Sequence, residues 1–149
     1  MNRRAADGFT LIELLVVLTI VSISLAYAVP KLVGREGGEL KDSARRLLYT
    51  TRRLSDEAQF RKEKRLLSID LDKGEYWDST GRKRSELPRH VVIERVIVGG
   101  TEIHRGVVSI TCFASGLRDE ALITLASTGR RAYTVVIPAL GERFELREE

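Results

Sequence analysis

The sequence predicts an α+β fold in which one long N-terminal helix packs against antiparallel β-sheet. Two changes of pattern along the 149 residues carry this prediction. An uninterrupted apolar segment leads into a stretch whose apolar residues recur every three or four positions, as they do on one face of a helix. Beyond residue 64 apolar and polar residues alternate, which is typical of half-buried strands. A chain of this length holds one ordinary domain and an appendage.

The apolar segment covers residues 9–29, and Glu13 is its one charged residue. A helix of this length rises about 31 Å, and the hydrocarbon core of a bilayer is about 30 Å thick. We therefore expect a membrane-spanning helix here. A secretory signal peptide cleaved after Ala28 is an alternative, with Arg3 and Arg4 as its basic region. A plain membrane anchor is another, but neither alternative gives the acid a purpose.

The residues around Gly8 offer an explanation for the acid. Residues 7–14 read DGFTLIEL, in which an aromatic residue follows the glycine and an acid stands four positions after Phe9. This segment resembles the leader junction of type IV prepilins and type II secretion pseudopilins. The resemblance implies that a prepilin peptidase removes residues 1–8 and methylates the new amine of Phe9. It also implies a cytoplasmic N-terminus and a periplasmic domain formed by residues 65–149.

Glu13 then has a role in assembly. A carboxylate in hydrocarbon is costly unless it is paired, and the freed amine of Phe9 on a neighbouring subunit is an equally costly cation. We expect the two groups to pair and so to set the register between subunits. The simpler alternative is that an acid in a first helical turn gains a few tenths to about 1 kcal/mol from the helix dipole.

Residues 30–64 are expected to continue the helix beyond a kink. Pro30 follows the apolar segment directly and several glycines come soon after it, a combination that bends or locally melts a helix. The following helix carries one apolar stripe, which we expect to dock on a sheet. The residues of this stripe are Leu40, Ala44, Leu47, Thr51, Leu54 and Ala58.

The remaining residues, 65–149, are predicted to form a β-rich domain. Residues 67–71 alternate between apolar and polar, residues 72–74 read Asp-Lys-Gly, and residues 75–78 complete a hairpin. Further strands are predicted at residues 90–98, 106–113, 120–126, 132–137 and 143–147.

Two C-terminal segments narrow the resemblance. They are CFASGLRDEALITLAS, in which residues 113–116 carry the likeness, and VVIPALGERFEL, in which residues 141–146 carry it. Together with the helical segment that begins LKDSARRLL at residue 40, they are similar to the minor pseudopilin H group of type II secretion. This group shares a domain type with FimT-like minor pilins. The resemblance implies a type IV pilin-like fold, whose long helix has a membrane-spanning half and an amphipathic half.

The function implied by this resemblance is structural. The chain would be a single-pass protein of the bacterial inner membrane that enters a short periplasmic pseudopilus at or near its tip and supports export of folded proteins. Its partners would be other minor and major pseudopilins, the prepilin peptidase, inner-membrane lipid before assembly, and the proteins of the secretion platform.

The residues give no sign of chemistry. Cys112 is the single cysteine and lies on a predicted strand, as a small buried hydrophobe does, and His90 and His104 have no acid at a telling spacing. Major pseudopilins bind calcium through a C-terminal loop, but the acids of this chain lack such a loop pattern, so turn and surface roles are expected. Trp77 is expected in the core. We expect no enzyme activity, cofactor, metal site or small-molecule substrate.

The basic residues raise the question of whether the chain binds nucleic acid. They gather at residues 61–65, 82–84 and 130–131, and FimT-like minor pilins that help to capture DNA are a family precedent for a phosphate-binding face. Acids at Glu63 and Glu86 interrupt or flank these clusters, and the net charge of +4 is small, so a solvated charged face is favoured. The alternative function is therefore a minor type IV pilin with affinity for DNA, in pilus assembly or DNA uptake.

Overall fold

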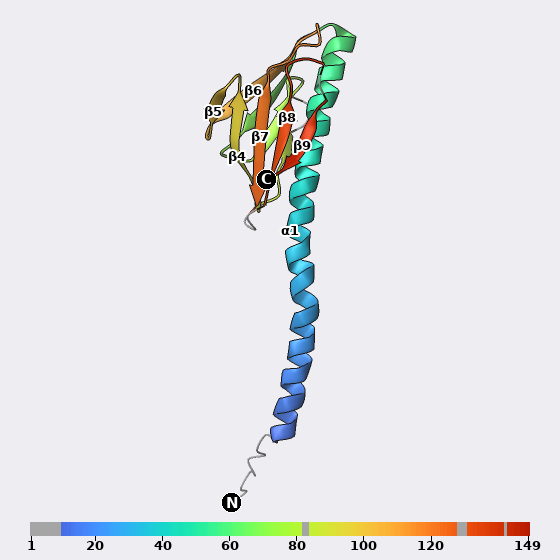
Figure 1. The fold of residues 1–149 in the computed structure, drawn as a ribbon, viewed down its shortest axis with the longest axis vertical. Helices are drawn as coiled ribbons and strands as arrows, with labels where there is room; N and C mark the ends of the chain where they lie inside the picture. The colour runs from blue at the N-terminus through green and yellow to red at the C-terminus, as the bar shows by residue number, and fades with distance from the viewer. Residues whose placement is uncertain (1–9, 82–83, 128–130, 142) are drawn as a thin grey trace, which may run out of the picture. The chain divides into compact units, whose positions relative to one another are not determined.

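The computed structural model describes residues 10–81, 84–127, 131–141 and 143–149, with the side chains of 27–37 excepted. The chain divides into two compact units, Met1–Arg35 and Glu36–Glu149. Helix α1 (Leu11–Arg61) belongs to both units, and nine strands belong to the second (Figure 1). The expected fold class, a helix packed on antiparallel β-sheets, is confirmed.

The first unit consists of the N-terminal part of α1. Its described residues are exposed at every position from Thr10 to Ala26. Among the residues that the structure describes, no helix is both long and apolar enough to cross a membrane. Phe9 and residues 27–29 of the expected membrane segment lie outside the described side chains. Helix α1 continues through Pro30, so the helix does not melt locally at this residue. A bend at Pro30 stays a prediction.

The end of α1 is set by one residue in the left-handed conformation. Lys62 has φ 57°, and the N–H of Glu63 donates to the carbonyl of Ala58 at 3.2 Å. This 6→1 hydrogen bond is the signature of a Schellman motif, which normally places glycine where Lys62 stands. Because the residue is not glycine, the sequence pattern placed the end of the helix a few residues too late.

The strands form two antiparallel sheets. The first contains β1 (Arg65–Asp70), β2 (Glu75–Asp78), β3 (Arg84–Glu86) and β6 (Val107–Cys112), in the order β3-β2-β1-β6. The second contains β4 (Val91–Val98), β5 (Thr101–Ile103), β7 (Ala121–Ser127), β8 (Ala132–Ile137) and β9 (Glu145–Glu148), in the order β5-β4-β7-β8-β9.

The predicted strands are confirmed to within a few residues, but β3 and β5 were missed. Strand β3 reads Arg-Ser-Glu and has no apolar residue that could produce a pattern. Strand β5 has three residues and pairs with β4 across a two-residue turn. Gly99 and Gly100 form this turn with φ 56° and 82°, a conformation that requires two residues at positive φ and so favours glycine.

A β-bulge in β4 explains why its apolar residues do not alternate simply. Ile93 pairs with Leu125 and Arg95 with Thr124, so Glu94 is the extra residue. The insertion places Ile93 and Val96 on the same buried face although they are three positions apart.

One core joins the second half of α1 to both sheets. All six residues of the predicted stripe are fully buried, which confirms the stripe. The polar member, Thr51, is satisfied because its hydroxyl donates to the carbonyl of Leu47 at 2.9 Å. The core receives its other side chains from one face of each sheet, among them Leu67, Ile69, Tyr76, Ile110, Ile123, Leu125, Val135 and Ile137.

Cys112 ends strand β6 inside the domain. Its side chain is fully buried, as expected for a small hydrophobe. Burial raises the pKa of the thiol to about 11, and this effect outweighs the neighbouring Arg118, which lowers it. The thiol is therefore neutral at physiological pH and unsuited to nucleophilic attack.

We predict that Cys112 of the folded chain resists alkylation. With a pKa of about 11, roughly one thiol in 1,000 is ionised at pH 8, and for an unfolded thiol of ordinary pKa the fraction is roughly one in four. Iodoacetamide should therefore react at least about 100-fold more slowly with the native chain than with the same chain in guanidinium, measured by intact mass. Equal rates in the two states would contradict the burial of this residue.

Candidate functional site

The first turn of α1 holds the residue with the strongest expected role. The backbone N–H of Glu13 donates to the carbonyl of Thr10 at 3.1 Å and lies 3.3 Å from its hydroxyl oxygen. Thr10 thus caps the helix, and Glu13 stands three residues later, as the acid of a capping box does. The Glu13 side chain is exposed. Among the residues whose side chains the structure describes, none forms an ion pair with it.

The helix beyond Glu13 exposes apolar side chains all round. Between Leu11 and Leu25 eleven large hydrophobic residues are 46% to 84% exposed. The hydroxyl of Thr19 donates to the carbonyl of Leu15 at 2.8 Å, so this polar side chain does not present an unpaired donor to apolar surroundings. A helix that is apolar on every side needs an apolar environment, which a membrane or a bundle of helices supplies.

Three of the sequence-predicted site residues lie outside this description. Gly8 and Phe9 precede the described residues, and Pro30 is among the residues of α1 whose side chains are not described. Cleavage after Gly8, methylation of Phe9 and a kink at Pro30 therefore remain predictions.

The two histidines of the second unit differ in exposure, since His104 is exposed and His90 is half-buried. His90 Nε2 lies 3.0 Å from a carboxylate oxygen of Glu39 on α1. His104 Nδ1 lies 3.3 Å from the carbonyl oxygen of Glu94 and its Nε2 lies 3.5 Å from Glu102. The polar contacts that the structure gives these two rings, within the described residues, do not include Cys112.

The acids that raised the question of calcium serve turns. Asp70 accepts the backbone N–H groups of Asp72 and Lys73 at 3.1 and 3.0 Å, and Asp72 accepts that of Gly106 at 2.9 Å. Asp119 accepts the N–H of Thr111 at 2.8 Å. Within the described ranges, no three His, Cys, Asp or Glu side chains gather as metal ligands would.

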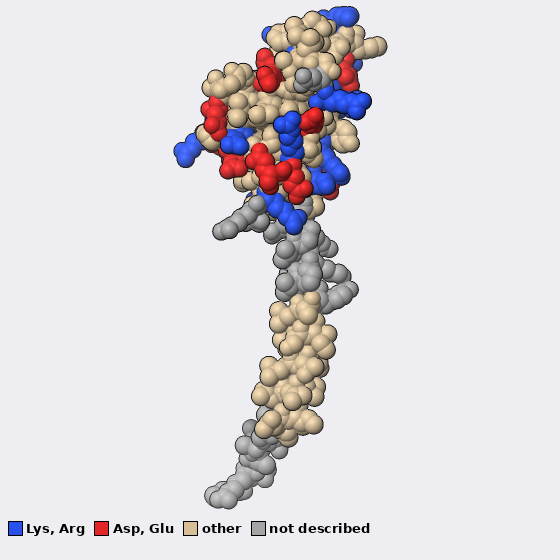
Figure 2. All heavy atoms as spheres, in the orientation of Figure 1, with Lys and Arg blue, Asp and Glu red and all other residues tan. Residues whose placement is uncertain are grey.

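The basic clusters are only partly described, because Arg82, Lys83 and Arg130 are outside the described residues. Of the others, Arg65 pairs with Glu63 at 3.1 Å and Arg84 with Glu75 at 3.4 Å. Figure 2 shows both signs of charge mixed over the visible face of the second unit.

Trp77 departs from its expected place in the core. It is half-buried, and the guanidinium of Arg84 lies 4.6 Å from the centre of its ring. The core position on β2 is taken by Tyr76, because neighbouring residues of a strand face opposite sides of the sheet.

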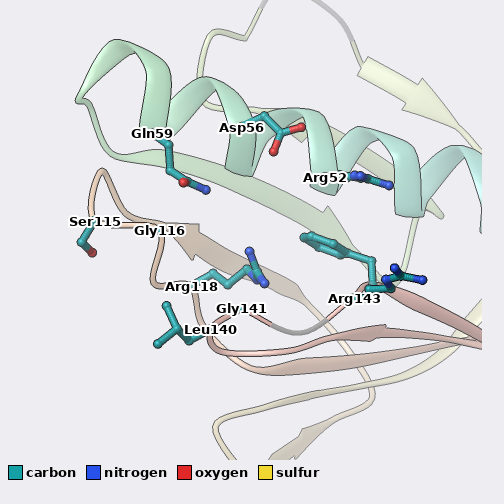
Figure 3. Close-up of a pocket in the computed structure, with 10 residues that line it drawn as sticks. Arg52, Asp56, Gln59, Ser115, Gly116, Arg118, Leu140, Gly141 and Arg143 are labelled. Carbon is teal, nitrogen blue, oxygen red and sulfur yellow. The ribbon is translucent and has the colours of Figure 1, made fainter.

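A pocket that sequence reasoning missed lies in the second unit (Figure 3). Its volume is about 590 Å3, and we call it the arginine pocket. Three segments line it: Arg52, Asp56 and Gln59 of α1; Ser115, Gly116 and Arg118 between β6 and β7; and Leu140, Gly141, Arg143 and Phe144 between β8 and β9.

Arg118 holds these three segments together. Its side chain is 9% exposed, its Nε donates to the carbonyl of Pro138 at 2.5 Å, and one Nη donates to the hydroxyl of Ser55 on α1 at 3.1 Å. Its guanidinium also lies 4.6 Å from the centre of the Phe144 ring, within the range of a cation–π interaction. In Figure 3 the Arg118 side chain points toward the helix.

Gly116 adopts a backbone conformation that favours glycine, with φ 90°. A Cβ atom built on it would lie 3.4 Å from the side-chain amide of Gln59, which is an ordinary van der Waals contact. Residues 113–116 and 141–146 both contribute to this pocket, and these are the two segments that carry the C-terminal resemblance. The shared resemblance of these two segments was the signal that could have pointed to the pocket. Their residue patterns alone do not indicate that they lie together.

Comparisons with known proteins bear on the N-terminal segment and on the fold. Residues 3–29 match the family described as the prokaryotic N-terminal methylation motif. No curated protein matches the sequence. The fold is similar to that of the minor pseudopilin EpsH from the type 2 secretion system of Vibrio cholerae, with a TM-score of 0.54 and 15% sequence identity. That likeness covers 74% of this chain and 96% of EpsH.

The methylation motif and the fold are those of structural pilin-like subunits rather than of enzymes. Together, the N-terminal motif and the fold confirm the resemblance of this chain to the pilin-like proteins.

Proposed function

We propose that the chain is a minor pseudopilin of a type II secretion system, placed at or near the tip of the periplasmic pseudopilus. The observation that carries this proposal is that one chain combines an N-terminal methylation motif, at residues 3–29, with a fold similar to that of a minor pseudopilin. The exposed apolar surface of the first unit supports it, because such a surface requires lipid before assembly and neighbouring helices afterwards.

The steps follow from the N-terminal residues. The prepilin peptidase cuts after Gly8 on the cytoplasmic side and methylates Phe9, and residues 9–29 anchor the chain in the inner membrane with residues 65–149 in the periplasm. The chain then associates with other minor and major pseudopilins and with the secretion platform. Its part in export is mechanical, since its fold is that of a structural subunit.

Glu13 selects the position of the chain in the assembly. The Thr10 cap already satisfies the backbone N–H of Glu13, and its carboxylate is exposed and has no ion-pair partner among the described side chains. In an apolar environment that carboxylate needs a cation. The amine of Phe9 on a neighbouring subunit supplies one, and pairing removes the cost of both charges in a single contact.

Deletion of the gene in its own bacterium tests the proposal. We expect culture supernatants to lose the exported proteins, which should accumulate in the periplasm, with recovery when the full chain is restored. Quantitative mass spectrometry of both fractions provides the measurement. Normal secretion together with lost pili or lost DNA uptake would contradict the proposal and favour the minor type IV pilin instead.

Substitution of Gly8 should block maturation. We expect Gly8→Leu to leave full-length precursor in the membrane, because the bulky side chain occupies the position before the cleaved bond. The wild-type chain should have the intact mass of a product that begins at methylated Phe9. Ala6→Leu, a change of similar bulk within the leader, is the matched control and should mature. A wild-type product beginning at Val29 would instead identify a signal peptide.

Glu13→Gln should separate pairing from helix capping. The amide keeps the size and hydrogen-bonding capacity of the side chain but loses its charge, so we expect normal cleavage and membrane insertion with at least about tenfold less chain in the sheared pseudopilus fraction. Thr10→Ala, which weakens the helix start by about 1 kcal/mol, is the comparison. If the two variants reduce incorporation equally, Glu13 acts only on the helix.

A further inference from the structure

The arginine pocket has more positive than negative charge. Arg52, Arg118 and Arg143 line it together with a single acid, Asp56. Arg52 and Arg143 are exposed, and in the part of the chain that the structure describes neither of them forms an ion pair. Arg118 is different, because Ser55, Pro138 and Phe144 fix its position. The exposed guanidinium groups of Arg52 and Arg143 therefore line a pocket in which Arg118 is held in place by its own contacts.

Apolar side chains are exposed on the same segments. Leu140, which lines the pocket, is 59% exposed. Phe113 and Leu117 are 41% and 47% exposed and are joined by a hydrogen bond from the N–H of Phe113 to the carbonyl of Leu117 at 2.8 Å. Phe60 follows Gln59 on α1 and is 88% exposed. Arginine among exposed aromatic and aliphatic residues is the composition that protein interfaces favour.

The remaining polar groups indicate which anion fits. Asp56 repels any anion, and it repels a carboxylate, which has one charge, less than a phosphate chain, which has many. It can also accept the backbone N–H groups that flank an acidic side chain in a polypeptide. Gln59 adds an amide with both donor and acceptor atoms. Binding to a nucleic acid requires a series of cations along the backbone, and the visible surface of this unit mixes both signs (Figure 2). The pocket is therefore suited to a protein carboxylate.

We infer that the arginine pocket docks an acidic side chain of a neighbouring pilin-like subunit. The carboxylate binds between Arg52 and Arg143, as guanidinium groups bind carboxylates with two parallel hydrogen bonds. The residues beside that acid pack on Leu140, Phe113 and Leu117. This inference rests on the proposed function in naming the partner as another pilin-like subunit, and it assigns the second unit a contact that is separate from the one made by Glu13.

Photo-crosslinking in the native bacterium tests the inference on the full chain. p-Benzoylphenylalanine replaces Ser115, an exposed residue that lines the pocket, and adducts are mapped by mass spectrometry. We expect one adduct with a pilin-like subunit, at a segment containing Asp or Glu. Arg52→Glu with Arg143→Glu should reduce its yield at least about tenfold, because both charge contacts become repulsive.

The matched control reverses two exposed arginines outside the pocket, with Arg89→Glu and Arg105→Glu. This variant has the same net charge and should retain the adduct. Thermal melting of both double variants establishes whether they fold. If the variant with Arg52→Glu and Arg143→Glu does not fold, the variant with Arg52→Gln and Arg143→Gln replaces it. A partner acid changed to Arg should restore the adduct with Arg52→Glu and Arg143→Glu. An adduct insensitive to these changes would overturn the inference.

Two further measurements complete the test. A fluorescent 20-nucleotide single strand is titrated with the full chain in detergent, and binding that disappears only in the pocket variant would overturn the inference in favour of a nucleic acid. A second chain carries the photo-reactive residue at Val17 of α1. Adducts with pilin-like subunits from Val17 but none from Ser115 would reject the pocket alone, whereas adducts from neither position would reject the proposed function.

Discussion

The burial of one helical stripe determines the shape of the second unit. Six residues spaced over five turns of α1 are removed from water, and the side chains that cover them come from both sheets. Each fully buried leucine contributes roughly 1.5 to 3 kcal/mol, so this contact outweighs any single polar interaction in the domain. The positions of the sheet ends, and therefore of the arginine pocket, follow from it. Arg118 can reach Ser55 only because the stripe has already fixed the helix beside the β6–β7 connection.

The two halves of α1 obey different constraints. The half in the second unit has one apolar face, which the domain itself covers, whereas residues 11–25 of the first unit expose apolar side chains on every side. The core cluster of the second unit contains no described residue of the first unit. A helix that is apolar on every side is stable in lipid or among other helices, and in such surroundings an unpaired carboxylate like that of Glu13 would cost far more than on the surface of the domain.

Much of this arrangement could be predicted from residue patterns. The stripe and seven of the nine strands follow from apolar periodicity, and the turns at Gly74 and at Gly99 from residues that tolerate positive φ. Strands β3 and β5 are too short or too polar to produce a pattern, and Lys62 ends the helix without the usual glycine. The pocket could not be predicted, because it depends on three segments brought together by packing. Its glycine, Gly116, is visible in the sequence, but the positive φ that favours glycine there and its position beside Gln59 are not.

The bulge at Glu94 joins two parts of β4 in which the core-facing residues follow opposite numbering. On the N-terminal side of this residue odd-numbered side chains enter the core, and on its C-terminal side even-numbered ones begin with Val96. Deleting Glu94 would leave Ile93 and Val96 two positions apart, so the regular alternation of a strand would keep both on the core face and Arg95 on the opposite face. Descendants of this chain can therefore lose this one residue without exposing the core, so evolutionary length variation within β4 should be confined to the bulge.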